Sequence, residues 1–337
     1  MLPVIPLSVL DLAPIASGST SGDALRNTLD LARRVELLGY HRYWLAEHHN
    51  LPGIASSAPA VLVGQVAAVT STLRVGSGGV MLPNHPPLVV AEQFGMLEAL
   101  HPGRIDLGIG RAPGTDPLTA QILRRSAAQL SEDAFPEQLW DLFGFFNGTF
   151  PEGHPYRRIT AVPALGNQPQ MWLLGSSGYS AQVAGMLGMP FAFAHHFSAV
   201  NTLPALALYR NRFEPSASHP KPYAMVAVAV ICAPTDEEAA RLAEPAGLSW
   251  IRLRSGRPGL FPSPDEVAAH EFTEDDRSVL RERAAGMIVG SPESVREKLA
   301  DLLEKTAADE LMVTTTTFRH ADRVRSYELL AGLFSAR

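Results

Sequence analysis

The chain has 337 residues, of which 46% are hydrophobic and 18% are charged, so it can bury a large core. Its net charge of −6, without a lysine- and arginine-rich block, argues against nucleic acid or an anionic membrane as the main partner. The single cysteine, Cys232, excludes a disulfide within the chain. The N-terminus lacks a basic leader and no apolar stretch reaches the roughly 18 residues of a membrane span, which predicts a soluble, cytoplasmic protein.

Short apolar segments alternate with helical patterns along the chain. The expected strands are residues 4–10, 42–46, 73–77, 104–109, 171–174, 191–194, 223–231 and 310–315. The expected helices between them include residues 24–38, 57–70, 87–100, 179–187 and 292–305. Eight strands separated by helices predict a closed parallel α/β barrel better than an open, doubly wound sheet, although periodicity alone does not exclude the sheet.

The second expected strand ends in polar residues. The apolar run from Tyr43 to Ala46 is followed by Glu47, His48 and His49. Adjacent residues of a strand point to opposite faces, so only one of the two histidines can point into a barrel. That histidine is a candidate for acid–base chemistry near neutral pH. Because the three residues are contiguous, they are not expected to converge on a metal ion, and no metal site is predicted.

Two later strands end in groups that suit a phosphate. The segment 104–111 ends in Gly110 and Arg111, and the segment 171–180 enters a helix through serines. The free N–H groups of a helix N-terminus bind anions, and an arginine supplies a permanent, forked positive charge. Together with the histidine, these groups suggest a phosphorylated organic cofactor.

Four segments, in order, resemble the bacterial-luciferase-like flavin monooxygenases: residues 44–49, 76–83, 103–111 and 172–180. The similarity covers roughly residues 3–231 and resumes near 287–335. The resemblance implies one TIM-type (β/α)8 barrel domain over residues 1–337, with insertions after the helix that follows strand four and after strand seven. It also implies reduced FMN as the cofactor.

The resemblance implies roles for individual residues. His48 matches the catalytic histidine, and Arg111, Ser177 and Ser180 match phosphate-binding positions. Ser176 falls where luciferase carries a glutamate, so its contact is expected through its backbone. Gly110 replaces luciferase's reactive cysteine, which puts light emission in doubt but not oxygenation.

Further residues are expected around the flavin. Gly78 and Gly79 match the place where the family holds a non-proline cis peptide bond under the isoalloxazine ring. His195 and His196 end the sixth strand, where they line the cavity or form a hydrogen-bonded structural pair.

Two insertions interrupt the alternation. In residues 144–170, Asn147-Gly148 between aromatic residues predicts a hairpin turn. The segment 233–290 is much longer than a usual connection, and its centre, residues 255–264, is rich in glycine and proline. It follows strand seven on the catalytic face, so it is expected to form a mobile lid over the flavin; a disordered surface insertion is the alternative.

The resemblance implies a two-component FMN-dependent monooxygenase that forms a flavin C4a-peroxide with O2 and oxygenates an organic substrate. An aromatic polyketide of an antibiotic pathway and a long-chain aldehyde are the candidate substrates. No NAD(P)H site is evident, so the reduced flavin is expected from a separate reductase. An F420-dependent oxidoreductase and a non-catalytic flavin-binding protein are the alternatives. Apolar residues on several faces of helices 57–70 and 87–100, together with the family, predict a homodimer.

Overall fold

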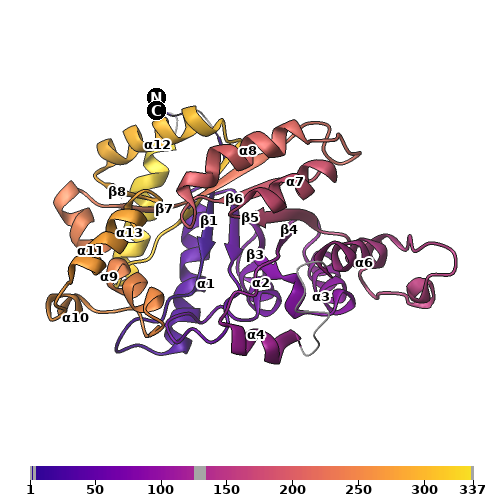
Figure 1. Cartoon of the computed structure of the whole chain (residues 1–337), viewed down its shortest axis with the longest axis horizontal. Coiled ribbons are helices and arrows are strands. Elements are labelled where there is room, and N and C mark those ends of the chain that lie inside the picture. The colour runs from indigo at the N-terminus through magenta and orange to yellow at the C-terminus, as the bar shows by residue number, and fades with distance from the viewer. Residues whose placement is uncertain (1, 3–4, 125–133, 335–337) are drawn as a thin grey trace.

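The computed structural model describes residues 2, 5–124 and 134–334. Eight parallel strands form a closed barrel surrounded by helices (Figure 1). The ring closes because β9 pairs with both β7 and β1. The barrel strands are β1 Leu7–Asp11, β2 Arg42–Leu45, β3 Arg74–Met81, β4 Ile105–Gly110, β5 Gln170–Gly175, β6 Phe191–Ala194, β7 Ala224–Cys232 and β9 Glu310–Thr314.

Each expected strand overlaps one strand of the barrel, and the (β/α)8 prediction is confirmed. The start expected at Val4 lies outside the described residues. One strand was missed: β8 (Met287–Gly290) pairs in parallel with the last residues of β7, outside the closed ring. Its four residues are too few to show the alternation that identifies a strand in sequence.

Helices connect the strands and cover the outside of the barrel. They are α1 Ser21–Leu37, α2 Pro59–Ala68, α3 Pro87–Leu100, α4 Pro117–Arg124, α6 Phe135–Asn147, α7 Gly178–Met186, α8 Thr202–Asn211, α12 Pro292–Thr306 and α13 His320–Phe334. Short 3-10 turns lie at η1 Leu82–Asn84, η3 Pro155–Arg158 and η4 Ala199–Asn201. Within the described residues, no helix combines the length and apolar character needed to cross a membrane.

The hairpin expected at Asn147-Gly148 is wrong. Helix α6 ends at Asn147, and Gly148 takes the left-handed conformation (φ 66°), with its N–H donating to the carbonyl of Gly144. An Asn-Gly pair suits a hairpin and a helix C-terminus for the same reason, because glycine adopts positive φ without strain. The packing of α6 against α3 decides between the two.

The second insertion, residues 233–290, is mostly helical rather than disordered. It contains α9 Asp236–Arg254, α10 Pro264–Ala268, α11 Glu274–Ala284 and β8. Its centre is irregular, as expected, but it is anchored to the loop after β1. The N–H of Phe261 donates to the carbonyl of Ile15 (2.8 Å), and the N–H of Ser17 donates to the carbonyl of Phe261 (2.8 Å).

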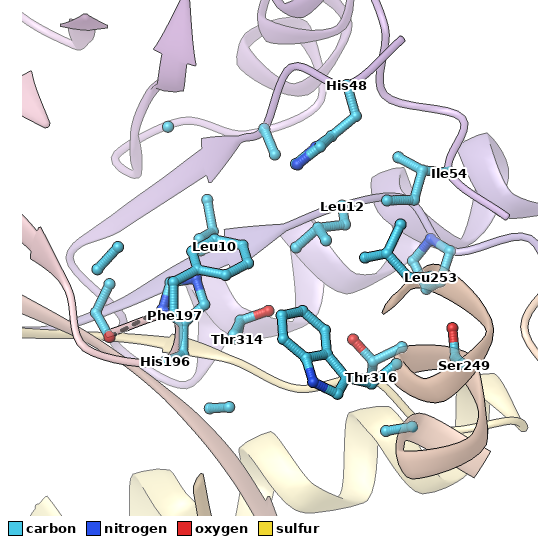
Figure 2. Close-up of a pocket in the computed structure, with 18 of the residues that line it drawn as sticks. Leu10, Leu12, His48, Ile54, His196, Phe197, Ser249, Leu253, Thr314 and Thr316 are labelled. Carbon is cyan, nitrogen blue, oxygen red and sulfur yellow. Dashed lines mark hydrogen bonds between the residues drawn. The ribbon is translucent and has the colours of Figure 1, made fainter. Parts of the chain in front are cut away.

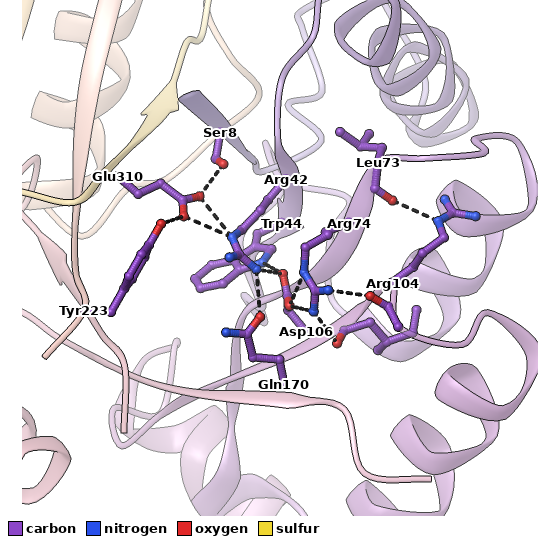
Figure 3. A network of polar contacts seen from close by, with 12 residues as sticks. Ser8, Arg42, Trp44, Leu73, Arg74, Arg104, Asp106, Gln170, Tyr223 and Glu310 are labelled. Atoms are coloured by element: carbon purple, nitrogen blue, oxygen red, sulfur yellow. Dashed lines mark hydrogen bonds and ion pairs between the residues drawn. The ribbon is translucent and has the colours of Figure 1, made fainter. Parts of the chain in front are cut away.

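A polar network fills the barrel near the N-terminal ends of the strands (Figure 3). Arg42 lies 2.8 Å from Asp106 and 3.0 Å from Glu310, and the indole N–H of Trp44 donates to Asp106 (2.9 Å). These buried charges are paired, as burial requires. In the part of the chain that the structure describes, this network and the apolar side chains above it fill the N-terminal end of the barrel, and the cavity described below lies at the C-terminal ends of the strands.

Candidate active site

Alternation along β2 brings His48 into the barrel. Trp44, Ala46 and His48 all line one cavity, whereas Tyr43 and Leu45 pack between the strands and the outer helices. The period of two continues past the end of the strand, so Glu47 and His49 lie on the opposite side from His48. The expectation that only one histidine points inward is confirmed.

The cavity has a volume of about 290 Å³ and lies at the C-terminal ends of the strands. Its walls are mostly apolar and come from every barrel strand except β4, together with the loops after β1 and β2 and the second insertion (Figure 2). Trp250, Leu253, Phe261 and Met287 are the large apolar side chains that the insertion contributes. Apart from tryptophans, the lining residues with polar side chains are His48, His196, Ser249, Arg283, Thr314 and Thr316.

His48 presents a neutral imidazole to this cavity (Figure 2). Its backbone N–H donates to the carbonyl of Ser56 (3.0 Å), and its Nδ1 atom is buried without a hydrogen-bond partner among the described residues. Burial lowers the pKa of His48 to about 4, although the nearby Glu47 carboxylate opposes the shift. His48 is therefore unprotonated at pH 7, because its pKa lies below the near-neutral value expected for a histidine.

Behind His48, Glu47 holds two further histidines. Its Oε1 atom lies 2.9 Å from Nε2 of His49 and 2.8 Å from Nε2 of His85, and its Oε2 accepts the N–H of Met81 (3.0 Å). Burial favours the protonated acid, but these hydrogen bonds prevail and hold the pKa of Glu47 at about 2. The carboxylate is thus a buried, charged anchor for the ends of β2 and β3.

Glu47, His49 and His85 are also three potential metal ligands. The ligand atoms of Glu47, His49 and His85 lie within 4.8 Å of one another, and His85 arrives from the loop after β3. This trio differs from the contiguous Glu47, His48 and His49 considered in the sequence, and nothing there marked His85 as a ligand. Their hydrogen bonds to one carboxylate account for the closeness without an ion.

Gly78 and Gly79 lie at the C-terminal half of β3, and the bond between them is cis, as predicted. Gly78 lines the cavity. A Cβ atom on Gly78 would lie 2.6 Å from Leu10 Cδ1, and one on Gly79 would lie 2.7 Å from the carbonyl oxygen of Gly108. Neither position accommodates a side chain, so the backbone itself forms this part of the wall.

On the neighbouring strands, the structure brings Arg111 to the N-terminus of α7. Arg111 follows the last residue of β4, and its guanidinium carbon lies 4.3 Å from the ring centre of Tyr179. Ser177 is the N-cap residue of α7 without a capping side-chain bond, and Ser176 is exposed beside it. Ser180, in the first turn, is buried. We call Arg111, Ser176, Ser177 and Ser180, which were expected to bind a phosphate, the phosphate clamp; these residues do not line the apolar cavity.

Of the two histidines after β6, the cavity is lined by His196 and not by His195. His195 Nδ1 lies 2.8 Å from the Thr202 hydroxyl, and burial lowers its pKa. His196 Nδ1 lies 2.9 Å from the carbonyl oxygen of Ala227, and burial lowers its pKa to about 4. Both histidines therefore make structural hydrogen bonds, and only His196 also faces the cavity.

Several lining residues had no signal in the sequence. Trp250 and Arg283 belong to the insertion helices, Thr314 is the last residue of β9, and Thr316 lies just after it. Residues of these types are common on the helices and strands of any barrel. Only the folded structure shows that their side chains meet at one cavity.

The fold and the cavity are those of an α/β-barrel enzyme with its site at the C-terminal ends of the strands. Residues 5–310 match the family model described as luciferase-like monooxygenase. The chain belongs to this family of flavin-dependent monooxygenases and is an oxidoreductase.

Relatives match along nearly the whole chain. An Escherichia coli (strain K12) luciferase-like monooxygenase is 47% identical over 325 residues, which is 96% of each chain. The uncharacterized protein YvbT of Bacillus subtilis is 52% identical and covers 98% of this chain and 97% of its own. An N-acetyl-S-alkylcysteine monooxygenase of Bacillus subtilis is 35% identical, covering 97% of this chain and 98% of its own.

Solved structures share the same architecture. The crystal structure of apo-MsnO8 superposes with a TM-score of 0.89 at 38% identity and covers 98% of both chains. The oxygenating constituent of 3,6-diketocamphane monooxygenase from Pseudomonas putida, in complex with FMN, superposes with a TM-score of 0.72 at 21% identity. The match covers 98% of this chain and 97% of that chain, and at this identity it supports the fold alone.

Proposed function

We propose that this chain is the oxygenase of a two-component system. It takes reduced FMN from a separate flavin reductase and uses O2 to oxygenate a small organic substrate. The observation that carries the proposal is the neutral imidazole of His48 on the wall of an apolar cavity that also contains Gly78. A dry wall and a single proton-handling side chain are what oxygenation by a flavin requires of the protein.

The residues present fit FMN. The flat backbone at Gly78 and Gly79 has no room for side chains and offers a surface for a planar ring system. The phosphate clamp follows the next two strands along the barrel edge, with the cation of Arg111 after β4 and the open N-terminus of α7 after β5. When bound, reduced FMN would supply the two electrons that activate O2, so that one oxygen atom of O2 goes to the substrate and the other leaves as water.

The chain's own side chains would then hold the proton and exclude water. With a pKa of about 4, His48 is free to accept a proton at pH 7. The apolar walls, including Leu10, Trp250 and Phe261, keep bulk water from the reacting atoms. Glu47 positions the segment that carries His48 through its bonds to His49 and Met81.

The apolar wall supports an apolar substrate, either an aromatic polyketide of an antibiotic pathway or a long-chain aldehyde. The Bacillus subtilis relative adds an S-alkylcysteine derivative as a third class. We also propose that the chain forms a homodimer. Val61 of α2 and Met96 and Leu100 of α3 are exposed apolar residues on two helices that pack against each other, and a second copy would cover them.

Stopped-flow mixing tests the proposal. Anaerobically reduced FMN with the protein is mixed with oxygenated buffer, and absorbance is followed. We expect a protein-dependent phase before oxidised flavin appears, which His48→Ala alters. Reoxidation at the rate of free FMN would overturn the proposal. The same mixing with reduced F420 then separates an F420-dependent oxidoreductase, which would turn over an organic substrate with it, from a non-catalytic flavin-binding protein.

A further inference from the structure

Arg283 is an unusual member of the cavity wall. It lies in the last turn of α11, in the second insertion, and its side chain lines the cavity. Among the described lining residues it is the only one with a permanent charge, and none of them is acidic. His48 and His196, the other titratable groups there, have pKa values lowered to about 4 by burial and carry no charge at pH 7.

The guanidinium of Arg283 has no carboxylate partner within the part of the chain that the structure describes. Its Nε atom contacts the sulfur of Met287 (3.1 Å), a weak acceptor, and its Cζ atom lies 4.7 Å from the ring centre of Trp250. Burial lowers the pKa of Arg283 to about 10, which leaves it charged at pH 7. By comparison, the buried arginines Arg42 and Arg323 are both paired with carboxylates. A partly buried charge without a counter-ion is unfavourable unless a ligand supplies one.

Arg283 is also connected to the reacting end of the cavity. A row of ring contacts runs from Arg283 over Trp250 to Phe197 (6.4 Å between ring centres) and on to His196 (4.4 Å). His196 lies close enough to both Arg283 and His48 for a positive charge on either to lower its pKa. The hydroxyls of Ser249, Thr314 and Thr316 face the same space (Figure 2).

We propose that Arg283 binds the anionic group of the substrate, so that the substrate class is an apolar molecule with one carboxylate or similar anion. The guanidinium would take the anion in a forked contact, Trp250 and Phe197 would cover the apolar body, and the reacting part would point toward His48. That the bound molecule is a substrate rests on the proposed function, but the binding of its anionic group to Arg283 requires no flavin.

A pair of isosteric probes tests this inference by calorimetric titration. The wild-type chain is titrated with 4-phenylbutanoate and with the neutral 4-phenylbutanamide. We expect the acid to bind at least roughly tenfold more tightly, as a charged hydrogen bond to a desolvated guanidinium would give. Equal affinity for the two probes, or binding of neither, would overturn the inference without any variant being made.

Variants then identify the side chain. Arg283→Gln should remove the preference for the acid, whereas Arg283→Lys should keep part of it through its charge. Arg281→Gln is the matched control, because Arg281 lies on the same helix, is exposed and pairs with Glu274. A preference that survives in Arg283→Gln would contradict the assignment. Flavin reoxidation is measured separately, so a failure of the oxygenase proposal is distinguishable from a failure of the anion site.

Discussion

The guanidinium of Arg111 stacks over the ring of Tyr179, with its Cζ atom 4.3 Å from the ring centre. Arg111 follows β4 and Tyr179 lies in the first turn of α7, so the contact joins two segments that are far apart in sequence. It holds a permanent cation beside an open helix N-terminus, where backbone N–H groups and the helix dipole favour an anion.

Arg111→Ala should therefore weaken FMN binding by roughly 30-fold, or about 2 kcal/mol, through loss of a charged hydrogen-bond partner. Riboflavin, which lacks the phosphate, should bind almost unchanged. Fluorescence titration with both flavins measures this. Arg157→Ala, a change of an exposed arginine on η3, is the control. An equal loss of riboflavin affinity in Arg111→Ala would contradict the phosphate role.

His48→Ala should reduce coupled product formation by about 100- to 10,000-fold, the usual worth of a general acid–base group. Flavin affinity should change little, because the phosphate clamp is on other strands. Product yield per reduced FMN consumed is the measurement. His219→Ala, on the loop before β7, should retain wild-type yield. Unchanged yield in His48→Ala would remove His48 from the mechanism.

Acid should destabilise the chain in a window set by its buried histidines. The pKa of His48 is about 4 in the folded chain and 6.5 in the unfolded chain. Below pH 6.5 the unfolded chain takes up a proton that the folded chain does not, so the free energy of unfolding falls as pH falls. Above pH 6.5 neither state is protonated there and the effect vanishes.

Denaturant unfolding across this pH range measures the effect. His48→Asn should flatten the pH dependence between pH 6.5 and 4.5 by about 2 kcal/mol. Glu47, whose pKa is lowered from 4.5 to about 2, contributes stability that is lost only below that window. Identical slopes for wild type and His48→Asn would show that His48 is not desolvated in the folded chain.

Glu47→Gln should destabilise the chain by about 1–3 kcal/mol, because an amide cannot satisfy His49, His85 and the N–H of Met81 as a carboxylate does. Thermal and urea unfolding report the change. Glu297→Gln, an exposed position on α12, should stay within about 0.5 kcal/mol of wild type. If both variants behave alike, the buried carboxylate is not the anchor described above.

Sedimentation velocity should show a dimer at micromolar concentration. Val61→Glu places a charge on the exposed apolar face of α2, where Val61 is 68% exposed, and should shift the chain to monomer. Val200→Glu changes an equally apolar, exposed residue on η4 and should leave the dimer intact. A monomeric wild-type chain would show that the apolar faces of α2 and α3 have another role.

Local patterns in the sequence were enough for the barrel and for part of the site. Each barrel strand is a short apolar run, and the period of two along β2 predicts that only one of His48 and His49 faces inward, which the family resemblance identified as His48. The serines before α7 could be recognised because the first turn of a helix leaves backbone N–H groups free to bind an anion, whereas Gly78 and Gly79 were recognised by their match to the family. The apolar runs, the alternation and the serines before a helix are patterns among residues that are adjacent in the chain, so a single sequence shows them.

Other features depend on contacts between distant segments, and only the tertiary structure decided them. Asn147-Gly148 ends a helix because α6 packs on α3, and His85 joins Glu47 because two loops meet above the barrel. Arg283 reaches the cavity because the insertion closes over it, and nothing in the local sequence around Arg283 distinguishes it from the exposed Arg281. The sequence alone determined the barrel and, with the family resemblance, pointed to His48 as the inward-facing histidine; the charge of Arg283 on the cavity wall followed from how residues far apart in the chain pack together.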